Sequence, residues 1–273
     1  MSSKTRAGGV FVMNAQERMQ LARDGYVLRE HVFSPRETAQ MAADCEQLMA
    51  ELVAMKRVAK PKVGGYVFEY RDELETTVKW ERDAPDQPRG VEPFAHLSPA
   101  LNKWGQDPRL LDPCKEVCGT EEVVLFTEKL NMKRAGTGGY VQLHQDFPYW
   151  EFYGPQASRV ATALVQLDDF TVENGCLQVT PGSHLNGKHV QRTEGAGLDK
   201  LEIDVNTYDM ASLIPLPAPA GSAIFFGGFL IHASAPNRSD KDRRALLYSY
   251  QPAGFPHVRE LNARLKERST QSS

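Results

Sequence analysis

The feature that most restricts the fold of this 273-residue chain is a succession of short apolar segments after residue 121. β-Branched and aromatic residues are frequent in these segments, and Gly, Pro or paired Asp residues separate them. Short strands punctuated in this way are typical of an all-β sandwich or barrel. We therefore expect strands at 123–126, 139–143, 159–167, 176–179, 222–226 and 245–250.

The N-terminal part of the chain carries helix signals instead. Ser34-Pro35-Arg36-Glu37 combines an N-cap serine, a first-turn proline and a glutamate three residues after the cap. Apolar residues at intervals of three or four continue this helix to Met55. We also expect a helix at 14–23, a strand at 25–28, a loop at 84–94 and helical turns between 101 and 118.

The layout of the chain predicts a single domain over residues 13–265, between disordered tails at 1–12 and 266–273. The section near 183–220 is rich in Gly, Asp and Pro and interrupts the strands. Long loops of this kind in compact domains are often lids or binding loops. We therefore treat it as an insertion in one domain.

Composition excludes several classes of protein. The chain is 41% hydrophobic and 25% charged, as in ordinary globular proteins. A formal net charge of −3 provides no basic footprint for nucleic acid. No apolar run approaches the ~20 residues of a membrane span and no secretory segment is visible, so we expect a cytoplasmic protein without membrane contact. The four cysteines fit neither a disulfide framework nor a paired Cys-x-x-Cys zinc site.

One short motif points to metal chemistry. In an extended segment, side chains two residues apart project to the same face, so His144 and Asp146 would present an imidazole and a carboxylate to one point. That pair is two thirds of the two-His-one-carboxylate face that holds Fe(II) with open positions. By itself it fits a strand-end histidine beside a solvated aspartate equally well.

A second histidine from a distant segment is required to complete such a face. His232 follows the apolar stretch 224–231, where a lone histidine is more often a core residue. Its successors Ser234, Asn237 and Arg243 make it the best candidate. The other histidines lie before the strand-rich region, after it, or in the long loop (His31, His96, His257, His184 and His189).

These residues belong to a set of motifs that resembles the phytanoyl-CoA dioxygenase family over roughly residues 20–255. The resemblance implies a mainly β fold with flanking helices, a double-stranded β-helix (jelly roll, cupin-like). It also implies Fe(II), 2-oxoglutarate as cosubstrate and O2. The motifs, which occur in the family's order, are His144-Gln145-Asp146 with Tyr149-Trp150, Glu173-Asn174-Gly175-Cys176-Leu177, Pro181-Gly182-Ser183-His184, and His232-x-Ser234-x-Pro236-Asn237-x-Ser239 with Arg243.

The resemblance assigns roles to individual positions. His144, Asp146 and His232 would be the metal ligands and catalytic residues. Arg243 would bind the far carboxylate of 2-oxoglutarate, which an arginine fork matches, and Ser234 would hydrogen-bond to the same group. Strand alternation allows only one of Arg243 and Arg244 to face inward, and the family's spacing selects Arg243, with Arg244 solvated or ion-paired.

Further positions are open to two interpretations. Gln142 shares the parity of His144 and would touch cosubstrate or substrate, or would be a buried glutamine bonded to backbone. Lys133 and Asn131 share a parity on the preceding strand; either would reach the cosubstrate, although a solvated lysine is the simpler interpretation. Tyr149 and Trp150 would form a substrate wall, with core packing equally open for Trp150.

The expected function is hydroxylation, or another oxidation, of an unactivated C–H in a small-molecule metabolite, with release of succinate and CO2. Related halogenases lack the triad carboxylate, so Asp146 favours hydroxylation. One alternative is an acyl-CoA hydroxylase of the same family, for which the basic segment 56–62 is too small to argue. Others are a non-catalytic jelly-roll ligand-binding protein and a zinc hydrolase, which would leave Ser234, Asn237 and Arg243 without a role.

Overall fold

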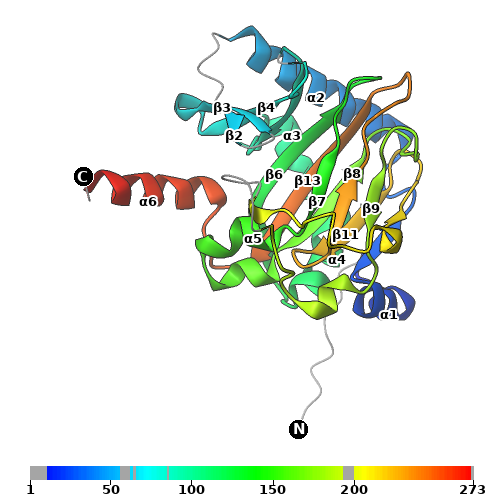
Figure 1. Cartoon of the computed structure of the whole chain (residues 1–273). Coiled ribbons are helices and arrows are strands. Elements are labelled where there is room, and N and C mark those ends of the chain that lie inside the picture. Colours follow the sequence, from blue (N-terminus) through cyan, green and yellow to red (C-terminus); the bar gives the residue numbers. More distant parts are fainter. Residues whose placement is uncertain (1–10, 56–61, 64–65, 85, 193–199, 272–273) are drawn as a thin grey trace.

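Two antiparallel sheets face each other in the computed structural model, which describes residues 11–55, 62–63, 66–84, 86–192 and 200–271 (Figure 1). In sheet order, the nine-stranded sheet consists of β1 (Tyr26–Arg29), β11 (Ala223–Gly227), β8 (Ala161–Gln166), β13 (Arg243–Pro252), β6 (Val123–Lys133), β5 (Pro88–Glu92), β4 (Thr76–Trp80), β3 (Tyr66–Arg71) and β2 (Lys62–Val63). The four-stranded sheet consists of β10 (Ile214–Pro215), β9 (Leu177–Val179), β12 (His232–Ser234) and β7 (Val141–His144).

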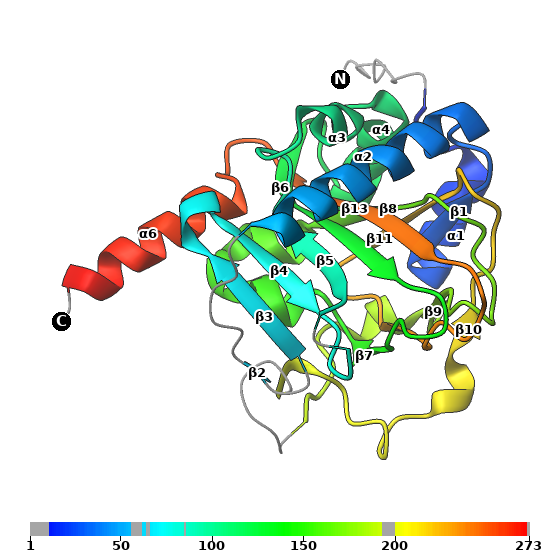
Figure 2. The same ribbon diagram turned by 90° about the horizontal axis from the view of Figure 1, so that it is seen from above.

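Helices cover the face of the larger sheet that is turned away from the smaller one (Figure 2). Helix α2 (Pro35–Ala54) begins as predicted, because Ser34 accepts a hydrogen bond from the Glu37 backbone and the Glu37 carboxylate accepts one in return. The other helices are α1 (Ala15–Asp24), α3 (Pro99–Trp104), α4 (Pro108–Cys118), α5 (Phe147–Trp150) and α6 (Val258–Gln271), with 3₁₀ turns η1 (Asp72–Leu74), η2 (Glu151–Tyr153), η3 (Pro155–Arg159), η4 (Ser183–Asn186) and η6 (Met210–Ser212).

The apolar core has two layers, one on each face of the larger sheet. Met41, Leu48 and Leu52 of α2 belong to the layer under the helices. Between the two sheets, side chains of β8, β9, β11 and β13 form a second cluster. Strand β8 is buried along its whole length because it lies between these layers. This accounts for the burial of all six residues, including the polar Thr162 and Gln166.

The expectation of a loop over residues 84–94 is wrong at 88–92, which form β5. Pro and Gly in this segment are typical of loops, but here the glycine serves the sheet. A Cβ on Gly90 would lie 2.2 Å from the Leu130 carbonyl oxygen, so only glycine permits the close approach of β5 to β6. Together with β2, β3 and β4, this strand extends the larger sheet beyond the predicted strands.

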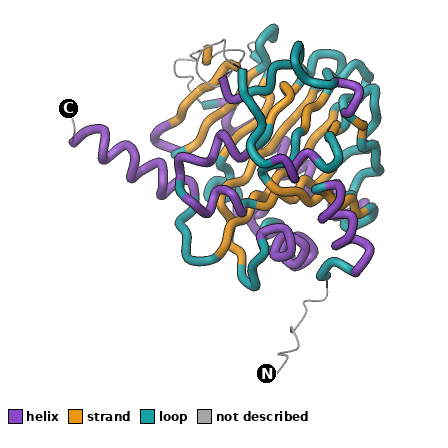
Figure 3. The backbone as a smooth tube through the Cα atoms, turned by 60° about the horizontal axis from the view of Figure 1, so that its bottom comes forward, coloured by secondary structure: helices purple, strands orange, loops and turns teal. Residues whose placement is uncertain are grey.

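The ends of the chain differ in part from expectation. Helix α6 projects from the body (Figure 3) and continues to Gln271, so residues 266–271 of the expected C-terminal tail are helical. Residues 1–10 and 272–273, part of the insertion (193–199) and most of the basic segment 56–62 lie outside the described residues. In the described ranges, no helix combines the length and apolar character needed to cross a membrane. All four cysteines are buried and free.

Candidate active site

The three predicted metal ligands meet in the smaller sheet. His144 is the last residue of β7 and His232 the first of β12, and the two are register partners. Asp146 follows β7 after one residue. Their candidate ligand atoms all lie within 4.8 Å of one another. The structure therefore brings together residues that are distant in sequence, as the motif required.

Backbone carbonyls orient both imidazoles. Nδ1 of His144 lies 2.7 Å from the Gln142 carbonyl oxygen, and Nδ1 of His232 lies 3.0 Å from that of Leu230. Because a carbonyl oxygen only accepts, we assign the ring proton to Nδ1 in both residues. Each Nε2 then offers its lone pair, the usual arrangement for histidine ligands of metals.

The protonation states of the triad suit a divalent cation. Burial and the neighbouring imidazole of His144 lower the pKa of His232 to about 4. Burial by itself would raise the pKa of Asp146, but the neighbouring His144 and the ammonium group of Lys129 hold it below its ordinary value. Near neutral pH the site therefore presents an unprotonated His232 and an ionised carboxylate.

Gln145, which the sequence did not single out as a functional residue, holds the strand end in place. Its side-chain amide donates hydrogen bonds to the carbonyls of Gly187 (2.8 Å) and Phe229 (2.7 Å) and accepts one from the His189 backbone (2.8 Å). The side chain thus ties the segment between His144 and Asp146 to two loops. Its membership of the family motif was the signal, but its partners depend on the tertiary fold.

Arg243 is buried in the wall of the cavity onto which the triad opens. Its side chain is 5% exposed and stacks on the Phe170 ring, with the guanidinium carbon 4.2 Å from the ring centroid. Nη1 donates a hydrogen bond to the Gly175 carbonyl oxygen (2.6 Å), whereas Nε is buried without a hydrogen-bond partner. A buried guanidinium with an unsatisfied donor is a fitting anchor for an anion.

The motif around Gly175 forms the turn that presents this carbonyl. Gly175 has φ +73°, and a Cβ there would lie 2.0 Å from the Ala235 carbonyl oxygen. Asn174 closes the turn, because its side chain accepts a hydrogen bond from the Thr171 backbone (2.9 Å) and donates one to the Asp169 carbonyl (2.7 Å). A larger residue at 175 would displace the acceptor of Arg243.

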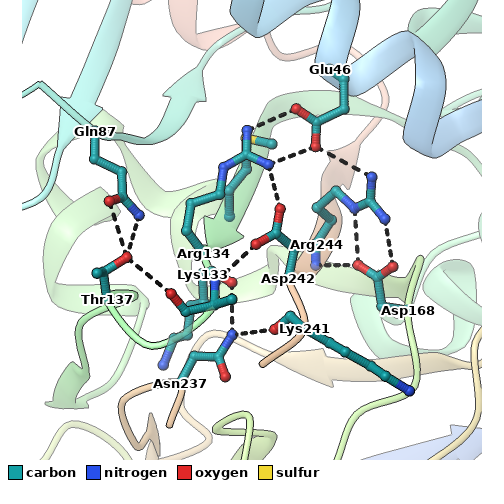
Figure 4. A network of polar contacts seen from close by, with 12 residues as sticks. Glu46, Gln87, Lys133, Arg134, Thr137, Asp168, Asn237, Lys241, Asp242 and Arg244 are labelled. Carbon is teal, nitrogen blue, oxygen red and sulfur yellow. Dashed lines mark hydrogen bonds and ion pairs between the residues drawn. The ribbon is translucent and has the colours of Figure 1, made fainter. Parts of the chain in front are cut away.

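Arg244 points to the opposite face, as strand alternation required. Figure 4 shows its guanidinium directed at Asp168 and Glu46, with Nη2–Oδ1 and Nη1–Oε1 distances of 2.6 and 3.3 Å. This side chain is ion-paired, one of the two outcomes expected for it. Of the two adjacent arginines, Arg243 is the one that lines the cavity.

The interpretation of Lys133 as a solvated lysine is wrong, because its side chain is only 4% exposed. Its Nζ donates hydrogen bonds to Ser234 Oγ (2.7 Å) and to the Ala235 carbonyl. Lys133 and Arg243 are register partners on β6 and β13, which places the lysine amine beside the guanidinium, next to Ser234. In Figure 4, the Asn237 amide donates to the Lys133 backbone carbonyl (2.9 Å) and fixes this end of β6.

The predicted aromatic wall lies beside the triad, whereas the interpretation of Gln142 as a buried glutamine bonded to backbone is wrong, because this side chain is only half-buried and bonds to a tyrosine hydroxyl. The Tyr149 ring meets the His144 ring edge-to-face at 5.7 Å. Trp150 packs against Phe126, with ring centroids 5.5 Å apart, and also borders the cavity, so it is a core residue whose contact with substrate stays a prediction. The Gln142 side chain donates to the Tyr140 hydroxyl (3.2 Å), while its backbone carbonyl orients His144.

One cavity of about 700 Å³, within the usual range for small-molecule sites, is lined by the triad and by Tyr149 and Trp150. Its lining also includes Ser234, Lys133 and Arg243, together with residues of β3, β4, β5, β6 and α6. The cavity therefore has room beside the triad for a cosubstrate and a second small molecule.

Fold and site together define a class of protein: a jelly roll with a two-His-one-carboxylate face that shares its cavity with a buried arginine. Comparison with known families gives the same answer. The chain belongs to the phytanoyl-CoA dioxygenase family, whose model matches residues 21–245. The family predicted from the sequence motifs is confirmed.

Individual relatives share parts of the chain to different extents. A methylphosphonate hydroxylase from Gimesia maris is 34% identical over 140 residues, covering 51% of this chain and 50% of that protein. An ectoine dioxygenase from Bordetella bronchiseptica is 25% identical over 251 residues, covering 87% and 75%. The chain thus spans about half the length of the first curated relatives that it matches.

Among solved structures, EctD from S. alaskensis with 2-oxoglutarate and 5-hydroxyectoine has a TM-score of 0.69 and 22% identity. The likeness covers 93% of this chain and 80% of that one. It establishes a common fold, and the predicted jelly roll is confirmed.

Proposed function

We propose that this protein is an Fe(II)- and 2-oxoglutarate-dependent dioxygenase that hydroxylates an unactivated C–H of a small molecule, with release of succinate and CO2. The observation that carries the proposal is the shared cavity: His144, Asp146 and His232 open onto the space lined by Arg243. Membership of the phytanoyl-CoA dioxygenase family supports it, as do relatives named ectoine dioxygenase and methylphosphonate hydroxylase.

The triad would hold the iron. Two imidazole nitrogens and one carboxylate are the donor set of the facial triad, and the orientation of both rings by backbone carbonyls fits a metal at their common point. When bound, Fe(II) supplies the O2-dependent oxidation chemistry. The protein's own contribution is to orient the ligands and to shape a partly dry cavity around them.

Arg243, Ser234 and Lys133 would bind the far carboxylate of 2-oxoglutarate. The unsatisfied Nε of Arg243 provides a donor for it. Ser234 Oγ already accepts a hydrogen bond from Lys133 Nζ, so its own O–H remains available to donate. Lys133, next to Arg243, would take up a proton as the carboxylate binds and so add a second positive charge. A dianionic cosubstrate would therefore offset the charge that this end of the cavity carries.

Tyr149 and Trp150 would border the substrate beside the triad. The Tyr149 ring already packs edge-to-face against the His144 ring, and the Trp150 ring packs against Phe126. Such a wall excludes water and favours the apolar part of a small molecule. We favour a free metabolite over an acyl-CoA ester as the substrate.

Anaerobic titration of the Fe(II)-loaded protein with 2-oxoglutarate tests the proposed function. We expect a saturable visible charge-transfer band, because the 2-oxo acid chelates iron that the triad holds. A zinc hydrolase would give none. If iron is bound and 2-oxoglutarate produces no band, the oxygenase assignment is wrong and the ligand-binding alternative becomes the better one.

Binding of 2-oxoglutarate should be coupled to proton uptake at Lys133. Burial and the neighbouring Arg243 lower the pKa of Lys133 to about 6, so the free protein loses this proton readily. A bound carboxylate favours the ammonium form and raises the pKa again. Between about pH 6 and roughly pH 10, the affinity for 2-oxoglutarate should therefore fall as pH rises, by at most about tenfold per pH unit.

Calorimetry in two buffers with different ionisation enthalpies measures this uptake. At pH 7.5, the apparent binding enthalpy of the anaerobic Fe(II) protein should differ between phosphate and Tris. The difference should vanish in Lys133→Met, which keeps the aliphatic stem but has no titrating group. Equal enthalpies in both buffers for the unmodified protein would show that Lys133 does not take up a proton.

A further inference from the structure

The part of the cavity wall not used by the triad or by Arg243 carries its own charged residues. They lie on neighbouring strands of the larger sheet: Lys79 on β4, Glu92 on β5 and Lys129 on β6. Lys79 pairs with Gly90 in the β4–β5 register, and Gly90 pairs with Asn131 in the β5–β6 register. Strand alternation then places all three charged side chains on the cavity face.

These three side chains form one cluster around the Glu92 carboxylate. Lys79 Nζ donates a hydrogen bond to Oε2 at 2.8 Å, and Thr127 Oγ1 donates one to Oε1 at 3.1 Å. Lys129 Nζ lies 3.6 Å from Oε1, an ion pair that is longer than a hydrogen bond. The lysine and glutamate side chains are only 18–24% exposed, so two cations share one anion in a largely enclosed place.

Lys129 lies on the side of the cluster that faces the triad. Its Nζ lies 5.3 Å from the centroid of the Trp150 ring, the aromatic wall residue. Its charge is one of those that hold the pKa of Asp146 low. Leu247, its register partner on β13, also lines the cavity. A molecule that contacts Lys129 therefore has an apolar path toward the candidate metal site.

The balance of charge distinguishes this cluster from the other ion pairs of the cavity wall. Arg259 pairs with Glu75, and Lys266 pairs with Asp72. Arg89 faces Glu81, with an Nη1–Oε2 distance of 3.7 Å. By contrast, Lys79 and Lys129 share Glu92, and the other carboxylate that acts on Lys129 is Asp146 of the triad. Because Asp146 is assigned to the metal face, the cluster itself carries one positive charge in excess. An excess charge in a partly desolvated site is unfavourable unless a ligand balances it.

We propose that Lys79 and Lys129 bind the anionic head group of the substrate, a carboxylate or a phosphonate, and that Glu92 holds the two ammonium groups in place. The carbon chain of the substrate then runs along Trp150 and Leu247 to the triad. This inference rests on the proposed function and specifies its substrate class: a small organic acid oxidised on carbon.

Binding of four probes that each contain six carbon atoms and differ in head group tests the inference. The anaerobic protein is loaded with Fe(II) and saturated with 2-oxoglutarate, so that Arg243 is occupied, and is titrated with hexanoate, hexylphosphonate, hexanamide and hexylamine. A hydrogen bond to a charged group is worth about tenfold or more in affinity. Whichever of hexanoate and hexylphosphonate binds more tightly, called the better acid below, should therefore bind at least about tenfold more tightly than the amide and the amine. Equal or tighter binding of the amide or the amine would overturn the inference.

Variants that remove a positive or a negative charge from the cluster should change the affinity for the acid in opposite directions. Lys79→Met and Lys129→Met should each weaken binding of the better acid by about tenfold and leave hexanamide unaffected. Glu92→Gln, which removes the negative charge, should strengthen binding of the acid. If the cluster only stabilises the fold, Lys129→Met and Glu92→Gln will change the affinity in the same direction or not at all, and the inference fails.

Two controls separate this inference from the proposed function. Lys115→Met removes a lysine of α4 that pairs with Asp112 at 2.8 Å outside the cavity, and it should leave the affinities for all four probes unchanged. The 2-oxoglutarate band is recorded for every variant. Its absence in the unmodified protein would contradict the proposed function, whereas an intact band without preference for the acids would contradict only the substrate class.

Discussion

Replacing Asp146 by Ala is expected to abolish succinate formation coupled to substrate oxidation. The substitution removes the only carboxylate of the candidate triad and leaves His144 and His232 as two neutral donors. Even substitutions of groups that merely support metal ligands cost about 10–100-fold, so the loss here should exceed about 100-fold. Succinate release under air measures the activity, and metal analysis of the same sample measures retained iron.

A matched aspartate serves as the control for this substitution. Asp209 caps η6, where its side chain accepts a hydrogen bond from the Ala211 backbone, and Asp209→Ala should retain full turnover. Asp146→Asn keeps the size of the side chain but not its charge, and it should behave like Asp146→Ala. Turnover at the unmodified rate by Asp146→Ala with iron still bound would remove Asp146 from the set of metal ligands.

The second large effect is expected for Arg243→Ala, which should weaken 2-oxoglutarate binding by at least about thirtyfold. Truncating one partner of a buried hydrogen-bonded charge pair costs about 2–5 kcal/mol. The variant would also leave the Gly175 carbonyl without its donor and the Phe170 ring without its cation. Anaerobic titration of the charge-transfer band gives the dissociation constant directly.

Arg244→Ala is the natural control, because the adjacent arginine has the same chemistry on the opposite face. It would lose its contacts with Asp168 and Glu46, which are partly exposed, and should cost about 1 kcal/mol of stability or less per ion pair. Its affinity for 2-oxoglutarate should not change. Arg243→Lys, which retains the charge without the fork, should recover only part of the binding. If Arg243→Ala bound 2-oxoglutarate with unchanged affinity, the assignment of Arg243 as the anchor of the far carboxylate would be wrong.

The candidate site could be predicted from the sequence to the extent that its geometry follows from local periodicity and ordered motifs. Alternation along an extended segment predicted that His144 and Asp146 would meet at one point, and they do, although β7 ends at His144 and Asp146 has the helical backbone conformation that precedes α5. Alternation also required Arg243 and Arg244 to face opposite ways. The order of the motifs identified His232. The burial of Lys133 could not be predicted in this way, because it depends on contacts between β12 and the end of β6, which are far apart in sequence.

The helix start at Ser34, most strands after residue 121, the family and the jelly roll were predictable from the sequence, because they depend on short-range signals or on ordered motifs. Which strands are neighbours was not predictable in this way, because it depends on the tertiary fold. That fold made His144 and His232 register partners, tied Gln145 to two loops, and turned the loop-like segment 88–92 into a strand. The cluster of Lys79, Glu92 and Lys129 exists for the same reason: its members meet only when β4, β5 and β6 pair, and pairing between distant segments leaves no periodic trace in any one of them.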